Sequence, residues 1–314
     1  FCEFNGIHTA LVGVNVPIQL TLSSFIECES AFTLQGGSPK DENLITGVDF
    51  YLCNIAFVIS CQGSVSIESC ELKLCTTGLQ LSGGYISISK GDFFQVNNTI
   101  SLLDYIPTLQ IIDNQFTECG SINFSSYFPL QTRQISKNSF TNSTDHSILI
   151  EGTEVWTLDN NVFAGGVGGV SLNSTTIFIE ACSFEDISGG KGSGILASNS
   201  NVTVANCDFL GMNAQGDGGA IWSDKCMVEI QNSSFVSCSA EMGGAIYAVD
   251  SFGFTIAVSS FLQCVASDVG GAIHLDSEVL DAYVDTSAFV GNSAFNGAAI
   301  SCCPSETCDI VVFE

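Results

Sequence analysis

The sequence predicts an all-β protein, a single-domain right-handed parallel β-helix (β-solenoid) of about 13 coils over residues 1–314, and three observations lead to it. First, the phrase "FVSCSAEMGGAIYA" at 235–248 returns as "FLQCVASDVGGAIHL" 26 residues later and as "FVGNSAFNGAAI" 28 residues after that. Second, short alternating segments precede the phrases. Third, equivalent positions carry similar residues. A period of roughly 20–50 residues is typical of solenoids, and right-handed crossovers dominate parallel sheets.

An aromatic residue anchors each repeat and predicts a ladder along the core. Successive anchors lie 21 to 28 residues apart. They are Phe4, Phe25, Phe50, Leu72, Phe93, Phe116, Phe140, Phe163, Phe184, Phe209, Phe235, Phe261, Phe289 and Phe313. A repeat of this length is too short for two helices and their turns, so we expect strands.

The alternating segments before the anchors are the first expected strands. Examples are "LQIIDNQF" at 109–116, "VTVANCDF" at 202–209 and "FTIAVSSF" at 254–261. Alternation with a period of two, rich in Ile, Val and Thr, predicts a β-strand with one buried face.

A glycine pair after the anchor predicts the next strand. It reads "GGAIW" at 218–222, "GGAIYA" at 243–248 and "GGAIH" at 270–274. Glycine permits a positive φ or a close approach of two backbones. We therefore expect a turn here, followed by a strand that buries Ala and Ile.

Small and amide residues stand two positions before the anchors. Asn114, Asn138 and Asn161 follow one another in this column, and Cys182 and Cys207 continue it. Stacked amides hydrogen-bond to one another and to the backbone. The sequence predicts an asparagine ladder at a turn.

The chain has 15 cysteines, and several share a column three residues after the anchors. Parallel coils place equivalent Cα atoms about 4.8 Å apart, which a disulfide tolerates. We expect disulfides between Cys238 and Cys264, Cys28 and Cys53, and Cys182 and Cys207; the alternative is a stack of buried free thiols. Near the C-terminus, a local or intermolecular disulfide is expected among Cys302, Cys303 and Cys308.

Six N-x-S/T sequons and the cysteine content favour an extracellular or cell-surface protein. The candidate N-glycosylation sites are Asn97, Asn123, Asn142, Asn173, Asn201 and Asn232. A removed export signal is consistent with this setting.

The formal charge of −26 limits the partners. A surface of this sign repels phosphate, so we expect no nucleic acid and no anionic membrane as partner. No apolar run is long enough for a spanning helix, so direct membrane insertion is not expected. Calcium would suit the charge, but no ligand cluster supports it, and the expected cofactor is none.

The "GGAI" tetrapeptides at 218, 243 and 270, with F-x-x-N at 289–292, resemble the paired repeat motifs of polymorphic outer membrane proteins. This family consists of secreted β-helical adhesins with a pectin-lyase-like fold. The resemblance is clear over residues 184–300 and rests elsewhere on the Phe column. It implies a surface or extracellular β-helix. Two departures are Cys in place of the Asn of F-x-x-N in most copies and the lack of a following membrane barrel.

A polysaccharide lyase or glycoside hydrolase is an alternative with the same fold. Hydrolysis requires converging carboxylates, and the sequence contains no distinctive acidic cluster. Lyase chemistry of the pectate type uses a basic residue, and Arg133 is the only arginine. We therefore expect no enzyme.

The two ends of the chain favour assembly. Phe4 and Phe313 stand at the same phase of the repeat, and neither end shows a polar or helical cap. An uncapped solenoid exposes unpaired backbone groups. The prediction is an extracellular structural protein whose terminal coils stack head-to-tail into a filament, and the runner-up is a monomeric surface adhesin that binds a cell-surface or matrix partner.

Overall fold

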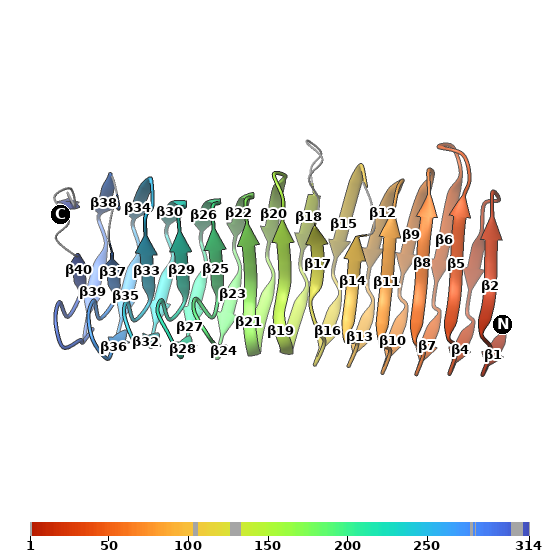
Figure 1. Ribbon diagram of the computed structural model, residues 1–314, viewed down its shortest axis with the longest axis horizontal. Helices are drawn as coiled ribbons and strands as arrows, with labels where there is room; N and C mark the ends of the chain where they lie inside the picture. The colour runs from red at the N-terminus through yellow and green to blue at the C-terminus, as the bar shows by residue number, and fades with distance from the viewer. Residues whose placement is uncertain are drawn as a thin grey trace. The chain divides into compact units, whose positions relative to one another are not determined.

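The structure is a computed structural model that describes residues 2–102, 106–125, 133–276, 279, 281–302 and 310–313, the last four by their backbone alone. Within these residues it contains strands and turns and no helix. They form two compact units, Phe1–Leu149 and Ile150–Glu314. Both are right-handed parallel β-solenoids, with about 12 turns in all, which confirms the predicted fold class (Figure 1). The single-domain organisation stays a prediction.

Unit 1 repeats three strands per coil. The short strands that carry the anchors are β1 (Glu3–Asn5), β4 (Ser24–Ile26), β7 (Asp49–Tyr51), β10 (Glu71–Lys73), β13 (Asp92–Phe94) and β16 (Gln115–Thr117). The strands after them are β2 (Thr9–Val14), β5 (Ser30–Gly36), β8 (Ile55–Cys61), β11 (Thr77–Ser82), β14 (Asn98–Leu102) and β17 (Ile122–Ser125). The third row is β3 (Gln19–Thr21), β6 (Glu42–Thr46), β9 (Ser64–Glu68), β12 (Tyr85–Ser89), β15 (Thr108–Ile112) and β18 (Arg133–Ser136). The part of β19 (Ser139–Glu151) up to Leu149 also belongs to this unit.

Unit 2 adds a fourth, two-residue strand to several coils. Its anchor row is the start of β21 (Val162–Asn173), then β23 (Ser183–Glu185), β27 (Asp208–Leu210), β31 (Ser234–Val236), β35 (Ser260–Leu262) and β39 (Ala288–Val290). The added strands are β24 (Ser188–Gly189), β28 (Asn213–Ala214), β32 (Ser239–Ala240) and β36 (Val265–Ala266). The row after the glycines is the end of β21, then β25 (Ile195–Ser198), β29 (Ile221–Asp224), β33 (Ile246–Val249), β37 (Ile273–Leu275) and β40 (Ile300–Cys302). The last row is β20 (Val155–Asp159), β22 (Thr176–Glu180), β26 (Asn201–Ala205), β30 (Met227–Gln231), β34 (Gly253–Ala257), β38 (Ala282–Asp285) and β41 (Ile310–Phe313).

The register of the short strands confirms the anchor column. In unit 1 Phe116 is paired with Phe93 and Phe140, and in unit 2 Phe235 is paired with Phe209 and Phe261. The Phe209 and Phe235 rings stack with centroids 4.7 Å apart and 1° between their planes. The predicted Phe116, Phe140, Phe163, Phe184, Phe209, Phe235, Phe261 and Phe289 all take part in such stacks within their units. Parallel pairing without slippage repeats each side chain at the spacing of the strands, and the ladder is the core.

The last predicted anchor, Phe313, is wrong. Phe313 pairs with Asp285 in the third row, whereas Phe289 stands in the anchor row. The backbone pairing begins with Ala282 opposite Ile310, so "IVVF" at 310–313 is the counterpart of "AYVD" at 282–285. The chain therefore does not stop at the phase at which Phe4 stands, which removes the phase match that favoured stacking of the terminal coils.

Two left-handed corners flank most anchors. Asp113 (φ 60°) and Glu118 (φ 52°) do so around Phe116, and Lys137 (φ 57°) and Asn142 (φ 52°) around Phe140. A non-glycine residue in this conformation is uncommon, so its repetition marks a tight turn that the rest of the coil maintains. These corners separate each short strand from the other strands of its coil. The side chains next to the corners point toward the core.

The asparagine ladder is confirmed in unit 1. The backbone N–H of Asn114 donates to Asn138 Oδ1 at 3.0 Å, and that of Gly91 donates to Asn114 Oδ1 at 2.8 Å. Each side-chain amide also donates to carbonyl oxygens near the corner. Asn161 lies in unit 2, where its backbone N–H donates to Cys182 Sγ at 3.4 Å.

The glycine pairs perform the two predicted tasks. The first glycine of each pair has a positive φ, as at Gly218 (65°) and Gly243 (61°). The second packs against the next coil, since a Cβ on Gly219 would lie 2.0 Å from the Gly244 carbonyl oxygen. Each position excludes side chains for a different reason.

Candidate functional site

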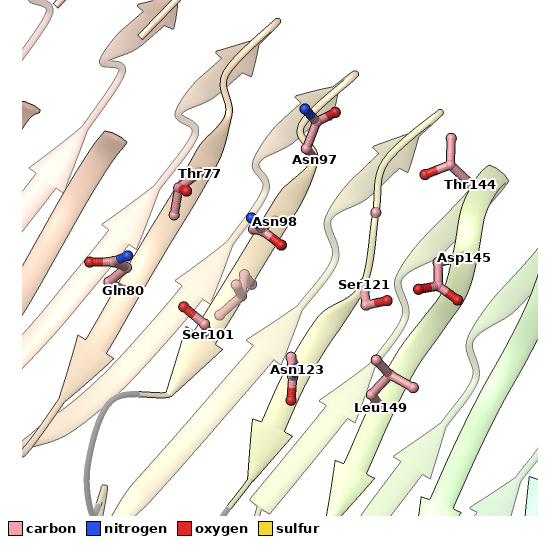
Figure 2. Close-up of a pocket in the computed structure, with 12 residues that line it drawn as sticks. Thr77, Gln80, Asn97, Asn98, Ser101, Ser121, Asn123, Thr144, Asp145 and Leu149 are labelled. Carbon is pink, nitrogen blue, oxygen red and sulfur yellow. The ribbon is translucent and has the colours of Figure 1, made fainter. Parts of the chain in front are cut away.

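A groove on unit 1 is the best candidate for a ligand site in the described structure (Figure 2). It encloses about 430 Å³, within the range of small-molecule sites. Side chains from β11, β14, β17 and β19 line it, and Figure 2 shows them spread over these neighbouring strands. The lining residues are Thr77, Gln80, Asn97, Asn98, Ile100, Ser101, Gly120, Ser121, Asn123, Thr144, Asp145 and Leu149.

Strand register produces the polar lining. Gln80 pairs with Ser101, and Ser101 pairs with Asn123. Alternation buries the neighbouring Leu79 and Ile122 in the core and leaves the polar residues on the outer face. Three successive coils thus present an amide, a hydroxyl and a second amide at one position.

The groove exists because β17 begins late. β14 pairs with β11 from Asn98 onward, whereas the first residue of β17 to pair with β14 is Ile122. Gly120 precedes the strand and lies so close to Asn97 that a Cβ would stand 1.7 Å from the Asn97 carbonyl oxygen. Thr99 Oγ1 donates to the Gly120 carbonyl at 3.0 Å and holds this segment in place. The outer face of the sheet is interrupted there.

Much of the lining has unused hydrogen-bonding capacity. Five polar side chains of the groove make no hydrogen bond with any described residue: Thr77, Gln80, Asn97, Asn98 and Ser101. Amides and hydroxyls both donate and accept. A ligand rich in hydroxyl or amide groups could pair with them.

Ser121 is the most informative of the lining residues. Its hydroxyl is covered from solvent and has no hydrogen-bond partner among the described residues. An unsatisfied buried hydroxyl costs roughly 1–3 kcal/mol. Because the hydroxyl is covered, a ligand in the groove could pair with it only after a neighbouring group moves.

The groove carries little charge. Asp145 is the one carboxylate among its lining residues, and its Oδ1 accepts a hydrogen bond from the His146 backbone N–H at 2.8 Å. No cationic side chain lines the groove. An anionic ligand would find no counter-charge there, so the lining suits a neutral or cationic one.

Comparison with known proteins gives the family. The family model of the right-handed β-helix region matches residues 125–289, slightly more than half of the chain. The chain belongs to this right-handed β-helix family. No match was found among curated proteins or solved structures.

The six sequon asparagines of the β-helix protein are all exposed. Asn97 and Asn123 line the groove. Asn142 lines an adjoining hollow that shares Asn97 and Thr144 with it. The three in unit 2 are Asn173, Asn201 and Asn232. The sequence identified these asparagines, but it did not show that those of unit 1 gather around one groove.

The three predicted disulfides are corrected by the structure, in which Cys238, Cys264, Cys28, Cys53, Cys182 and Cys207 are buried free thiols. Cys264 Sγ lies 3.6 Å from the carbonyl oxygens of both Leu262 and Phe235. Cys28 Sγ makes the same pair of contacts with Ile26 and Phe4. These thiols thus contact carbonyl oxygens at the corner of their own coil and in the preceding coil. A stack of buried free thiols was the alternative to disulfides that the sequence left open.

Four of the buried thiols are poor acids in this environment. Burial raises the pKa of Cys70, Cys119 and Cys226 to about 11. Burial also raises the pKa of Cys238 well above its usual value, and the neighbouring Cys264 raises it further. Thiolate is the reactive form of cysteine, so these four side chains are suited to packing.

Cys302 is in a disulfide, as predicted for the C-terminal group. Cys303 and Cys308 lie outside the described residues. Among the described residues, no group of three or more His, Cys, Asp or Glu side chains could hold a metal ion. In the same part of the chain, no helix is long and apolar enough to cross a membrane.

Arg133, the one arginine available for lyase chemistry, is 1% exposed in β18. Its Nη2 donates to the Ile106 carbonyl oxygen at 3.4 Å. A base in a lyase must reach a substrate proton. Because Arg133 lies in the core of unit 1, it cannot reach a polysaccharide that is bound at the protein surface.

Unit 2 also contains a column of aromatic side chains. Trp222, Tyr247 and His274 occupy one register position in β29, β33 and β37. Tyr247 Oη donates to Asp276 Oδ2 at 2.5 Å, and His274 is 2% exposed. Burial lowers the pKa of His274, against the opposing effect of the nearby Asp276, Asp217 and Asp268 carboxylates.

The groove itself was not predicted from the sequence. Its residues come from separate coils, and each polar residue alone is an ordinary outer-face residue. The column of polar residues formed by Gln80, Ser101 and Asn123 could have indicated the groove.

Proposed function

We propose that this β-helix is a binding protein of the adhesin type, displayed at a cell surface or secreted, whose groove in unit 1 holds a neutral oligosaccharide. The observation that carries the proposal is the row of unpaired amides and hydroxyls beside the covered Ser121 hydroxyl. The resemblance of the "GGAI" and F-x-x-N motifs to polymorphic outer membrane protein adhesins supports the same class. The exposed sequons and the Cys302 disulfide support the location.

The chemistry of the lining favours a sugar. Sugar hydroxyls both donate and accept, as the side chains of Gln80, Asn98 and Asn123 do. The coils repeat at about 4.8 Å, so the groove offers equivalent groups at regular intervals to a ligand built of repeating units. The formal charge of −26 opposes a polyanionic sugar.

Binding without cleavage is the form of the proposal. Hydrolysis of a glycosidic bond uses two carboxyl groups on either side of it, and the groove contributes Asp145. Release of reducing or unsaturated sugar ends by the protein would favour an enzyme instead. The head-to-tail filament stays a prediction from the sequence.

The test begins with the unglycosylated full-length chain and an array of neutral, amino and uronic acid oligosaccharides, followed by calorimetric titration of the best neutral ligand. Gln80→Ala and Asn98→Ala should each raise Kd about threefold to tenfold, the value of one hydrogen bond. Gln115→Ala is the matched control, because Gln115 is an exposed amide of unit 1 outside the groove.

Saturable binding that the groove variants weaken and Gln115→Ala leaves unchanged supports the proposal. Equal affinity in all three variants, or no binding to any neutral or amino sugar, contradicts it.

A further inference from the structure

The geometry points to N-glycosylation of Asn97 and Asn123 as a device that closes the groove, an inference that rests on the proposed function. Both asparagines are exposed and both line the groove (Figure 2). A glycan attached to either would occupy the space of about 430 Å³ that the ligand needs. The groove would bind ligand only on chains that lack these two glycans.

The amide nitrogens of the two groove asparagines are unengaged. Within the described residues, Asn97 makes no side-chain hydrogen bond, and Asn123 uses only its Oδ1, which accepts from Ser125 Oγ at 3.4 Å. By contrast, Nδ2 of Asn173 donates to Glu151 Oε1 at 3.3 Å, and Nδ2 of Asn232 donates to Asn206 Oδ1 at 2.6 Å. The groove asparagines thus present the atom that carries a glycan without breaking a contact.

The two sites differ in when they can react. The hydroxyl of the Asn97 sequon belongs to Thr99, which is fully buried and donates to the Val96 and Gly120 carbonyls at 3.2 and 3.0 Å. Ser125, the hydroxyl residue of the Asn123 sequon, is exposed. Asn97 is therefore modified on the nascent chain, before residue 120 packs against it. Asn123 stays accessible to glycosylation after folding.

The modification is a glycosyl transfer from a lipid-linked oligosaccharide pyrophosphate, the co-reactant. Asn Nδ2 forms a bond to C1 of the first sugar while the bond between C1 and the pyrophosphate oxygen breaks. The pyrophosphate leaves with the electron pair of that bond, and the amide loses one proton to solvent or to the transferase. The product is a neutral glycosylated amide.

The experiment compares full-length chains made with and without a secretory glycosylation pathway. Peptide mass spectrometry measures occupancy at Asn97 and Asn123, and titration with the neutral oligosaccharide from the preceding test measures Kd. The double variant Asn97→Gln and Ser125→Ala removes both sequons while keeping an amide at both positions. Ser234→Ala is the matched control, because it removes only the Asn232 sequon of unit 2.

The expected result is that secreted chains occupied at the groove sites bind with a Kd at least tenfold weaker than the bare chain, so that the degree of occupancy decides which chains bind. The double variant should bind with the same Kd, within twofold, whether it is made with or without the secretory pathway, whereas Ser234→Ala should keep the tenfold difference between the two preparations. If the sites are occupied and Kd is unchanged, or if both asparagines are unmodified in the secreted chain, the closure of the groove is contradicted and the proposed function is not. Failure of the bare chain to bind overturns the proposed function and the closure with it.

Discussion

The backbone N–H of Cys264 donates to Asn292 Oδ1 in the next coil at 2.8 Å. Asn292 Nδ2 donates in turn to the Phe261 carbonyl oxygen at 3.0 Å, and Cys264 Sγ makes the equivalent contact with Phe235. Cys and Asn therefore perform one task at this position, which is to join a left-handed corner to the coil before it. This explains why Cys replaces the Asn of F-x-x-N in most copies.

Cys264→Asn should fold with a free energy of unfolding within about 1 kcal/mol of the parent, whereas Cys264→Ala should lose about 1–2 kcal/mol with its hydrogen bond and its volume. Urea titration followed by circular dichroism measures both. An asparagine variant no more stable than the alanine variant would contradict the shared role.

Phe209→Ala should lower the free energy of unfolding by about 3–5 kcal/mol. Phe209 is 1% exposed and stacks on both Phe184 and Phe235. The next residue, Leu210, is 45% exposed, so Leu210→Ala is the control, with an expected change of about 0.5 kcal/mol or less. Equal losses in the two variants would argue against the aromatic ladder as the core.

Stability should fall as the pH rises from 9 to 11. The pKa of Cys70, Cys119 and Cys226 is about 11 in the folded chain, against 9.0 for an ordinary thiol. The unfolded chain therefore loses these protons first, which favours unfolding by at most about 3 kcal/mol per thiol. Denaturant titrations at several pH values measure the slope, and Cys119→Ser should reduce it. A flat profile over this window would contradict burial of the thiols.

Gly120→Ala should disturb the groove, because the new Cβ would meet the Asn97 carbonyl oxygen at 1.7 Å. The expected loss of stability is about 1–3 kcal/mol, with weaker binding of the neutral oligosaccharide. Gly190→Ala is the control, since nothing lies within 4 Å of a Cβ at that position. Thermal unfolding and calorimetric titration check the pair, and similar behaviour of both variants would contradict the close approach.

Unit 2 should become less stable below about pH 6.5. Burial holds the pKa of His274 below its usual 6.5, so the unfolded chain takes up the proton first as the pH falls. The nearby Asp276, Asp217 and Asp268 carboxylates oppose this effect but do not reverse it. His274→Leu should flatten the acid side of the stability profile, measured by denaturant titration from pH 8 to 5. An unchanged acid slope in that variant would contradict the assignment.

The anchor and ladder columns could be read from the sequence because parallel coils place equivalent residues in register. Phe235 over Phe261 and Asn114 beside Asn138 follow from the repeat and from the strand spacing alone. The fold class and the role of the glycine pairs follow in the same way, since a left-handed turn and a close backbone approach both need glycine.

Other features depend on how whole coils pack. The pattern "IVVF" at 310–313 indicates a strand but does not show to which row of strands it belongs, and Phe313 was therefore assigned to the wrong row. Column spacing alone could not separate a disulfide from two stacked thiols, because the orientation of each Sγ toward carbonyl oxygens decides it. The groove arises from the late start of β17 beside Asn97 and Asn98, a relation between coils that no single repeat contains. Local pattern therefore determined the repeat, and tertiary packing decided where its surface opens.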